Sequence, residues 1–370
     1  MKRILVTGGA GFIGQRTCRA LLSKGYEVRV LDRLTAPVHA NGSWPSTLEA
    51  TERIVGDVRS RDDWRRALGG VSEVIHLAAY QDYLPDFSTF MSTNATGTAL
   101  LFEVIVSERL PIERVVIASS QAVYGEGRYR CAEHGDRFPD ARSLEQLRRR
   151  QWEIECRDCR RPLAWMPTAE SHVNPQNAYG ISKLTQELIG VHLGRRYGIP
   201  TVALRYSITQ GAGQSMFNAY SGICRIFASC VLSRRPLPVY EDGGQRRDYV
   251  YVDDVVAANL LALEDARTDY DVFNVGGQEA ITVIEYARLV GAVAGQETQL
   301  ELAGRFRVGD TRHIVSDSSK LAALGWHRTT GLEQIIAEYL TWLAHQDLPE
   351  RLAEQAVERM LELGVVGTAG

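Results

Sequence analysis

The sequence predicts an α/β fold: a doubly wound parallel sheet, a smaller α/β domain after it, and an insertion between them. Short apolar, β-branched runs alternate with amphipathic stretches through the first part of the chain. Such runs are typical of parallel strands buried on both faces, and βαβ alternation puts helices on both sides of the sheet. The length of 370 residues suits two domains. The expected strands are Ile4–Val6, Val28–Leu31, Arg53–Val55, Glu73–Leu77 and Arg114–Ala118, with Phe12–Lys24 and Thr89–Arg109 among the helices.

The later elements divide the chain further. A helix is expected at Ala178–Arg196 and a strand at Thr201–Arg205, and from about Met216 the strands become shorter and the helices scattered. We therefore predict a main domain at 1–125 and 173–215, a polar insertion at 126–172, a smaller domain at 216–345 and a helical tail at 346–370. Within the smaller domain we expect helices at Val250–Leu263, Thr282–Ala294 and Leu332–His345 and a strand at Val272–Val275.

Composition narrows the class of protein. The formal net charge is −3, and no basic stripe indicates a nucleic acid partner. The apolar stretch at the start is shorter than a signal peptide needs, and no run reaches the roughly 18 apolar residues of a membrane span. We expect a soluble cytosolic protein, in which the six cysteines are free thiols or metal ligands rather than disulfides.

A glycine pattern follows the first expected strand. Gly8, Gly11 and Gly14 lie between that strand and a helix. Glycine lets the backbone approach a pyrophosphate, which the helix N-terminus also attracts. The alternative is a tight strand–helix turn without a ligand.

Residues after the next strands favour a dinucleotide over that alternative. Asp32 ends the second strand, where a carboxylate accepts ribose hydroxyls and repels a 2′-phosphate, so NAD is favoured over NADP despite the neighbouring Arg33. Asp57 is expected at the adenine amino group, and Asn94 either near the nicotinamide or simply at a helix start. The expected cofactor-binding residues are Gly8, Gly11, Phe12, Ile13, Gly14, Asp32, Arg33, Asp57, Val58, Leu77, Ala78, Ala79, Asn94, Tyr179 and Lys183.

Tyr179 and Lys183 form a candidate catalytic pair. Their spacing puts both side chains on one face of a helix. A tyrosine is a poor base at its ordinary pKa near 10, and a lysine together with the nicotinamide charge lowers that value. Ser120 ends the fifth strand, where open α/β sheets bind ligands, and is expected to hold the reacting oxygen. The alternative is a packed aromatic residue beside a surface charge.

These motifs together resemble the extended short-chain dehydrogenase/reductase family. The resemblance rests on TGGAGFIG at 7–14, Asp32, Gly56-Asp57-Val58, His76-Leu77-Ala78-Ala79, Ser119 through Gly125, Tyr179 through Lys183, Arg247 through Asp254 and Arg307 through Asp310. It covers Lys2 to about Ala344 apart from the insertion. It implies a Rossmann-type NAD-binding domain, a nucleotide-sugar substrate, and a homodimer through the helices near Thr89–Arg109 and Ala178–Arg196, whose apolar faces could equally belong to the core.

Within that family, two residues after the hydroxyl separate reactions. Dehydratases carry an Asp-Glu pair where this chain has Gln121 and Ala122, and decarboxylases carry a glutamate in place of Ala122. The resemblance therefore implies a 4-epimerase that acts through a transient keto sugar. A decarboxylase, a ketoreductase or another net oxidoreductase of the family is the alternative, and an NAD-binding regulatory protein without activity is the non-enzymatic one.

The substrate side is expected to use two arginines and several polar residues. By the resemblance, Arg247 and Arg307 hold the diphosphate of a UDP- or dTDP-sugar, although each also has an aspartate (Asp248, Asp310) nearby for an ion pair. The expected substrate-binding residues are Gln81, Ser119, Ser120, Gln121, Arg247 and Arg307. Ile208 replaces a common family asparagine, and Tyr80-Gln81-Asp82-Tyr83 is aromatic and acidic. Both departures suggest a deoxy or aminated sugar.

The insertion carries a metal-ligand pattern. Cys131-x2-His134 and Cys156-x2-Cys159 resemble the two knuckles of a zinc ribbon, in which all four positions of a tetrahedral ion are filled by protein. We expect a structural zinc site there, since a polar insertion has little core of its own. Reduced thiols in a polar loop are the alternative. Cys18, Cys224 and Cys230 lie in apolar contexts and are expected in the core.

Overall fold

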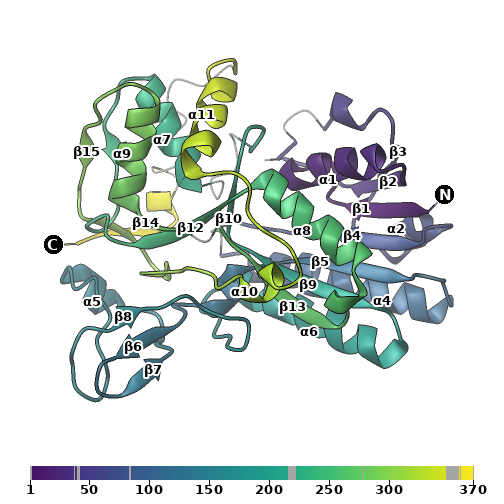
Figure 1. Ribbon diagram of the computed structural model, residues 1–370, viewed down its shortest axis with the longest axis horizontal. Coiled ribbons are helices and arrows are strands. Elements are labelled where there is room, and N and C mark those ends of the chain that lie inside the picture. The colour runs from purple at the N-terminus through teal and green to yellow at the C-terminus, as the bar shows by residue number, and fades with distance from the viewer. Residues whose placement is uncertain are drawn as a thin grey trace.

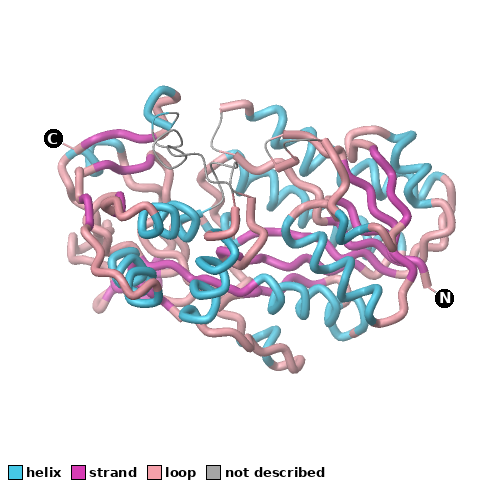
Figure 2. The backbone as a smooth tube through the Cα atoms, turned by 90° about the horizontal axis from the view of Figure 1, so that it is seen from above, coloured by secondary structure: helices cyan, strands magenta, loops and turns pink. Residues whose placement is uncertain are grey.

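A seven-stranded sheet forms the centre of the main domain. The structure is a computed structural model that describes residues 2–36, 38–39, 42–82, 85–215, 222–277, 279–346, 358 and 360–369. The strand order is β13-β9-β5-β4-β1-β2-β3, and every neighbouring pair is parallel. The strands are β1 Arg3–Thr7, β2 Glu27–Asp32, β3 Glu52–Val55, β4 Glu73–His76, β5 Arg114–Ser120, β9 Thr201–Tyr206 and β13 Asp271–Val275. The predicted doubly wound sheet is confirmed (Figure 2).

Helices cover both faces of this sheet. Successive residues of β1 point to opposite sides, so that Val6 joins a buried cluster with Val255 of α8 and Leu5 joins another with Leu101 of α4. One face carries α1 (Phe12–Ser23) and α8 (Val252–Glu264), and the other carries α2 (Arg61–Leu68), α4 (Gly97–Ser107) and α6 (Ala178–Tyr197) (Figure 1). The hydrophobic core therefore lies in two layers around the sheet.

The second domain is built on a small mixed sheet. Its strands are β10 (Ile208–Gln210), β12 (Arg246–Tyr251) and β14 (Ala280–Thr282), and its helices are α7 (Gly222–Leu232), α9 (Val283–Val293) and α11 (Leu332–Leu343). A capping box starts α9, in which Thr282 and Glu285 satisfy each other's backbone N–H groups. Two strand pairs complete the domain: β11 Leu237–Pro238 with β15 Leu300–Glu301, and β16 Arg305–Arg307 with β17 Val366–Thr368.

Several expected boundaries were wrong. The predicted helix at Val250–Leu263 begins only at Val252, because Val250 and Tyr251 end β12. β13 lies at the edge of the main sheet beside β9, so the chain returns to the first domain after 216. The expected helix Thr89–Arg109 is α3 (Phe87–Phe90), a π-helical turn at Met91–Thr96 and then α4. Met216 itself lies outside the described residues.

The tail also differs from the prediction. Residues 347–357 and 359 lie outside the described part, but β17 of the expected helical tail is a strand that pairs antiparallel with β16. The remaining short elements are η1 Ser46–Leu48, η3 Gln121–Tyr124, η4 Ala266–Thr268 and α10 Ser319–Ala322. Among the described residues, no helix has both the length and the apolar character needed to cross a membrane.

The insertion forms a separate lobe. It contains β6 (Tyr129–Cys131), β7 (Gly135–Arg137) and β8 (Ala164–Trp165), which make a three-stranded antiparallel sheet, and helix α5 (Leu144–Arg148). The lobe lies beneath the second domain, at the lower left of Figure 1. It joins the framework between η3, which directly follows Ser120, and α6, which carries Tyr179 and Lys183.

Candidate active site

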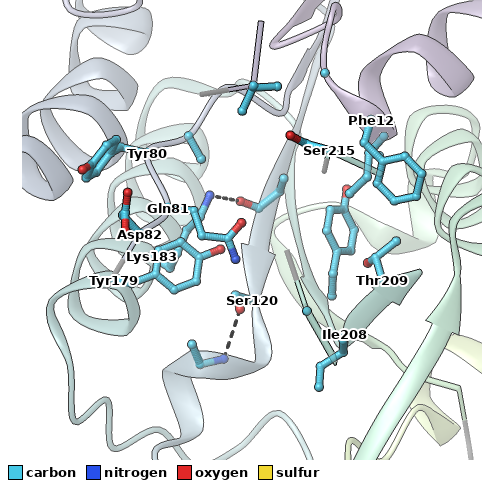
Figure 3. A pocket seen from close by; sticks show the side chains of 18 of the residues that line it. Phe12, Tyr80, Gln81, Asp82, Ser120, Tyr179, Lys183, Ile208, Thr209 and Ser215 are labelled. Carbon is cyan, nitrogen blue, oxygen red and sulfur yellow. Dashed lines mark hydrogen bonds between the residues drawn. The ribbon is translucent and has the colours of Figure 1, made fainter. Parts of the chain in front are cut away.

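A cleft of about 870 Å³ lies at the carboxyl ends of the main strands and reaches the second domain. Open α/β sheets bind ligands at this edge. Figure 3 shows Tyr179, Lys183 and Gln81 on one side of the cleft, with Phe12, Thr209 and Ser215 across from them. The structure therefore brings the predicted cofactor motif and the predicted catalytic pair to one place.

The backbone turn between β1 and α1 has room for a bound pyrophosphate. Gly8 has φ +67°, and a Cβ there would lie 2.8 Å from the backbone nitrogen of Ala78. At Gly14 a Cβ would lie 2.2 Å from the Gly8 carbonyl oxygen, so the helix packs directly on the turn. Gly11 is the N-cap of α1 and supplies no side-chain cap. The first N–H groups of α1 therefore remain available to a phosphate.

The acidic residues of the cofactor side have different surroundings. The Asp32 carboxylate is held in place by the N–H groups of Ala10 (3.0 Å) and Leu34 (2.9 Å). Asp57 instead accepts from Arg59 (2.7 Å) and Arg33 (3.2 Å). Burial opposes its ionisation, but these arginine contacts outweigh burial and lower the pKa of Asp57 to about 2. The Arg33 guanidinium thus has a carboxylate partner within the protein, and the preference for NAD rests on the Asp32 carboxylate at the end of β2.

The other predicted cofactor residues divide into two groups. Those that line the cleft are Phe12, Ile13, Val58, Leu77, Ala78 and Ala79. Asn94 is different: it is fully buried, exchanges hydrogen bonds with the backbone of Tyr80 (2.8 and 3.0 Å) and donates to Ser182 (2.9 Å). Its side chain therefore ties the loop after β4 to the catalytic helix. The expected place beside the nicotinamide stays a prediction, whereas the helix-start alternative was wrong, because Asn94 lies inside the π-helical turn.

The start of α6 places Tyr179 beside Ser120. The Asn177 side chain caps the helix by accepting from the N–H of Gly180 at 2.8 Å. A Cβ on Gly180 would lie 2.5 Å from the Ala122 carbonyl oxygen, so glycine allows α6 to pack on η3. Tyr179 is buried and hydrogen-bonds with Ser120, whose hydroxyl also accepts from the N–H of Ala122 (3.2 Å). The hydroxyl and phenol therefore meet at one point of the cleft.

The electrostatics of the pair differ from the expectation. Burial raises the pKa of Tyr179 to about 12, although the hydrogen bond from Ser120 acts in the opposite direction. Burial lowers the pKa of Lys183 to about 7, against the attraction of Glu187. The protein residues alone therefore do not lower the tyrosine pKa, and the expected contribution of the nicotinamide charge stays a prediction.

A buried hydrogen-bond chain fixes Lys183. Its Nζ donates to the Ala118 carbonyl oxygen (2.8 Å) and to Gln186 Oε1 (2.9 Å). Gln186 donates in turn to Thr98 (2.9 Å), which contacts His76 (3.1 Å). Burial lowers the pKa of His76 to about 3, so the ring is neutral. Sequence reasoning missed Gln186, although its spacing of three from Lys183 on one helix was a usable signal.

The predicted substrate residues also differ in their availability. Gln81, Ser120 and Gln121 line the cleft, and Gln121 Oε1 is buried without a hydrogen-bond partner. Ser119 lines it too, but its hydroxyl donates to Glu187, which pairs with Arg205 (2.7 Å). The Ser119 hydroxyl is therefore already used in a buried hydrogen bond. Gln121 keeps a buried side-chain oxygen without a partner, which a ligand can use.

The two predicted phosphate-binding arginines meet at one carboxylate. Arg247 Nη2 lies 3.3 Å and Arg307 Nη1 3.8 Å from Asp310, and all three residues line the cleft. Burial opposes the ionisation of Asp310, but the guanidinium groups of Arg247, Arg307 and Arg142 hold its pKa below the ordinary range. Asp248 instead accepts from Ser207 at 2.8 Å and from Gly277 at 2.6 Å. Two positive groups thus face one negative group.

The four predicted metal ligands lie together in the insertion lobe. The side-chain ligand atoms of Cys131, His134, Cys156 and Cys159 are all within 4.8 Å of one another. The other cysteines, Cys18, Cys224 and Cys230, are buried in the core as expected. None of the four ligand residues lines the cleft, so this cluster takes no direct part in its chemistry.

The fold and the cleft define a dinucleotide-dependent enzyme that acts on an alcohol or a ketone. Comparison with known proteins agrees. The sequence matches the NAD dependent epimerase/dehydratase family over residues 4–143 and 162–276. This chain belongs to that family, and the expectation of an NAD-dependent epimerase-family enzyme is confirmed. The match is interrupted within the insertion lobe.

Individual relatives cover nearly the whole chain. The dTDP-L-rhamnose 4-epimerase of Burkholderia thailandensis is 34% identical over 358 residues, which are 93% of this chain and 96% of that protein. The UDP-glucose 4-epimerase of Thermotoga maritima, solved with UDP-glucose, superposes with a TM-score of 0.75 at 26% identity, over 92% of this chain and 98% of its own. The UDP-glucose 4-epimerase of Thermus thermophilus, solved with NAD, gives a TM-score of 0.72 at 28% identity, over 93% and 100%.

Proposed function

We propose that this protein is an NAD-dependent 4-epimerase of a nucleotide-diphosphate sugar. The observation that carries the proposal is the convergence of Ser120, Tyr179 and Lys183 in a cleft where Gln121 and Ala122 offer no acid or base. Tyrosine, serine and lysine suffice to oxidise and reduce one carbon. Dehydration and decarboxylation need a further carboxylate, which is missing at these two positions.

In the proposed reaction, the catalytic residues act first in the oxidation of C4 and then in its reduction. Tyr179, as tyrosinate, takes the proton of the C4 hydroxyl while Ser120 hydrogen-bonds the same oxygen. NAD supplies the redox chemistry, since it accepts the C4 hydride and returns it. The 4-keto sugar turns over in the cleft before the hydride returns to its other face, and Tyr179 gives its proton back to the oxygen. Protons and electrons balance within one turnover, so no co-substrate is consumed.

The cradle residues support NAD as the cofactor. Gly8, Gly11 and Gly14 leave room for the pyrophosphate, and Asp32 presents its fixed carboxylate at the end of β2. Lys183 is placed to contact the nicotinamide ribose from α6. Several structural relatives were solved with NAD, including the Thermus thermophilus enzyme.

For the sugar, a 6-deoxyhexose linked to dTDP or UDP is the first candidate. Ile208 lines the cleft where a polar asparagine is common in the family, so this part of the cleft is less polar than in the common members. The Burkholderia thailandensis relative acts on such a sugar by its name. The test is incubation with a panel of UDP-, dTDP- and GDP-sugars, followed by NMR without added cofactor. Interconversion of plain UDP-glucose and UDP-galactose alone would contradict the deoxysugar assignment.

The same panel separates the alternative reactions. A ketoreductase consumes NADH in an amount equal to product and a decarboxylase releases carbon dioxide, whereas an epimerase turns over many times on its bound cofactor and releases neither. Stoichiometric NADH or carbon dioxide would therefore replace the epimerase assignment. Absence of turnover on every sugar, with NAD bound, would favour a regulatory protein.

Replacement of Arg247 by lysine tests the diphosphate assignment. Lysine keeps the charge but loses the bidentate geometry, so we expect KM for the nucleotide sugar to rise about tenfold with little change in kcat. Steady-state kinetics measure the effect. The neighbouring Arg246→Lys is the matched control, because Arg246 packs over Trp165 and does not line the cleft. Equal KM values for both variants would remove Arg247 from the substrate site.

We also propose that the protein is a homodimer through α6 and its neighbours. Ile181 and Leu188 of α6 are 45% and 50% exposed, and their spacing of seven puts them on one face. Phe87 and Met91 add further exposed apolar surface nearby in the fold. We expect Leu188→Glu to convert a dimer into a monomer in analytical ultracentrifugation. The control is Leu302→Glu, at an equally exposed position in the second domain, and a monomeric parent would contradict the proposal.

A further inference from the structure

The four ligand residues of the insertion lobe are arranged as around one tetrahedral ion. Cys131 Sγ lies 3.4 Å from His134 Nδ1 and 3.6 Å from Cys159 Sγ, and Cys156 Sγ lies 3.6 Å from the same His134 nitrogen. Zinc–sulfur and zinc–nitrogen bond lengths in a tetrahedral site give ligand separations of roughly 3.5–3.8 Å. A disulfide would need sulfur atoms about 2.05 Å apart. The spacing is thus that of metal ligands.

The backbone of both ligand pairs supports thiolates. Cys131 Sγ accepts hydrogen bonds from the backbone of Glu133 and His134, and Cys156 Sγ accepts from Asp158 and Cys159. Each pair sits in a tight turn: the first between β6 and β7, the second closed by the bridge between Glu155 and Pro162. The two turns repeat one arrangement, in which N–H groups two and three residues after the cysteine point at its sulfur. A lone reactive cysteine does not need this repetition.

The lobe has too small a core to hold this arrangement by packing. Its buried apolar cluster consists of Tyr129, Cys131, Ile154, Cys156 and Leu163, so two of the five members are ligands themselves. Units this small normally need a metal or disulfides. We propose that Cys131, His134, Cys156 and Cys159 bind one structural zinc ion, and that the lobe it orders positions the arginines of the substrate cleft.

The lobe is joined to the cleft by buried ion pairs. Arg142 of the lobe makes a bidentate pair with Glu241 of the second domain (2.9 and 2.9 Å) and donates to the Asp310 carbonyl oxygen (3.1 Å). Arg142 and Glu241 are both nearly inaccessible to solvent. Such a pair is costly to break from one side, because the remaining charge stays buried. The lobe therefore holds the backbone at Asp310. The side chain of this residue contacts both arginines of the cleft, Arg247 and Arg307.

A second connection leads directly to Arg247. Glu126 and Glu153 of the lobe accept from the backbone (2.7 Å) and the side chain (2.5 Å) of Arg312. Arg247 in turn donates to the carbonyl oxygens of Thr311 (2.9 Å) and Arg312 (3.1 Å). The segment 310–312 thus lies between the lobe and the guanidinium that we assign to the diphosphate.

Apolar packing supports the other arginine. Leu147 of α5 and Trp152 of the lobe share a buried cluster with Phe306 of β16, and the rings of Trp152 and Phe306 lie 6.4 Å apart. Phe306 is the residue next to Arg307 on that strand. Arg247 therefore hydrogen-bonds with a segment that contacts the lobe, and Arg307 follows a residue that packs against the lobe. This part of the proposal depends on the proposed function, which assigns the two arginines to the substrate.

Metal analysis tests the zinc site without any assay of activity. We expect elemental analysis of the full chain, purified without added zinc, to give about one zinc per chain. Cobalt(II) in its place is expected to give the absorption of a tetrahedral thiolate site. The double variant Cys156→Ser/Cys159→Ser is expected to lose the metal, while Cys224→Ala, which removes a thiol from the core of the second domain, keeps it. Metal-free protein with free thiols, or with a Cys131–Cys159 disulfide, would overturn the site.

Nucleotide binding tests the positioning role. UDP and dTDP are titrated by calorimetry, and the one that binds the parent better is used for the variants. We expect at least a fivefold rise in Kd in the double cysteine variant, with unchanged NAD content because the cradle lies in the other domain. Arg142→Lys is expected to keep the zinc and to weaken the nucleotide similarly, since it loses only the bidentate contact. Loss of zinc with an unchanged Kd would overturn the positioning role.

The remaining outcomes are also decisive. If the double variant loses its NAD and its cooperative melting transition, Arg142→Lys decides alone, and an unchanged Kd at full zinc content overturns the positioning role. If neither nucleotide binds the parent, the diphosphate assignment falls and the zinc result stands. Since neither measurement uses turnover, failure of the epimerase assay is distinguishable from failure of this proposal.

Discussion

Replacement of Tyr179 by phenylalanine is expected to lower kcat by roughly 10²–10⁴-fold, the usual contribution of one acid–base group. The substitution removes a single oxygen. The ring keeps its edge contact with Phe90, whose centroid lies 6.5 Å away, and Ser120 and Lys183 remain in place. KM for the nucleotide sugar should therefore change little. NMR with the sugar that proves active in the panel gives both kinetic constants.

A second tyrosine on the same helix provides the control. Tyr197 ends α6 at the far end from Tyr179 and is 49% exposed, so Tyr197→Phe should leave kcat, KM and the melting temperature unchanged. The Tyr179→Phe variant should also retain its bound NAD. If it keeps more than a tenth of the parent activity, Tyr179 is not the proton acceptor, and the epimerase mechanism proposed above fails with it.

The main sheet was predictable because its signals are local. Each of its first five strands is a short apolar run between helical patterns, and the right-handed crossover rule restricts how such strands can be arranged. β13 was not assigned to this sheet, because it follows elements of the second domain and joins β9 only through a long-range contact. The apolar run from Val250 to Leu263 shows a related limit: periodicity alone cannot separate the end of β12 from the start of α8.

The candidate site also has a part that was predictable from the sequence and a part that was not. Residues at strand ends and helix starts, such as Asp32, Ser120 and Tyr179, lie in the cleft where their positions in the motifs predict. Partners from distant segments could not be predicted: the sequence offers Asp310 as a neighbour of Arg307, but only the structure brings Arg247 to the same carboxylate. The contacts of Asn94 with Tyr80 and Ser182 were also not predictable, because only the tertiary structure brings these segments together.

The pKa of Tyr179 shows why a motif does not determine its own chemistry. The spacing of Tyr179 and Lys183 predicts a lowered tyrosine pKa, but spacing carries no information on burial. The structure buries both residues, which raises the pKa of the phenol and lowers that of the ammonium group. Each change disfavours the charged form that the mechanism requires. The charge on Lys183 is favoured by the attraction of Glu187 and by its hydrogen bonds to Ala118 and Gln186.

Replacement of Lys183 by methionine is expected to lower kcat at neutral pH by roughly 10²-fold or more. Without the ammonium group, which lies 6.0 Å from the centre of the Tyr179 ring, the phenol loses a positive charge that favours its ionisation. The pKa of Tyr179, which burial already raises, should rise further in the absence of substrate and cofactor. In the pH profile of kcat, the acid limb should move upward by at least one unit, with partial recovery of activity at alkaline pH.

A companion variant separates the charge of Lys183 from its placement. Gln186→Leu removes the acceptor 2.9 Å from Lys183 Nζ but keeps the ammonium group, so we expect a smaller loss, about tenfold, and a smaller shift of the limb. Melting temperature and NAD content identify any general damage to the fold. A drop in kcat for Lys183→Met with the acid limb unmoved would mean that the lysine only holds the cofactor, because loss of its charge must otherwise appear in the ionisation of Tyr179.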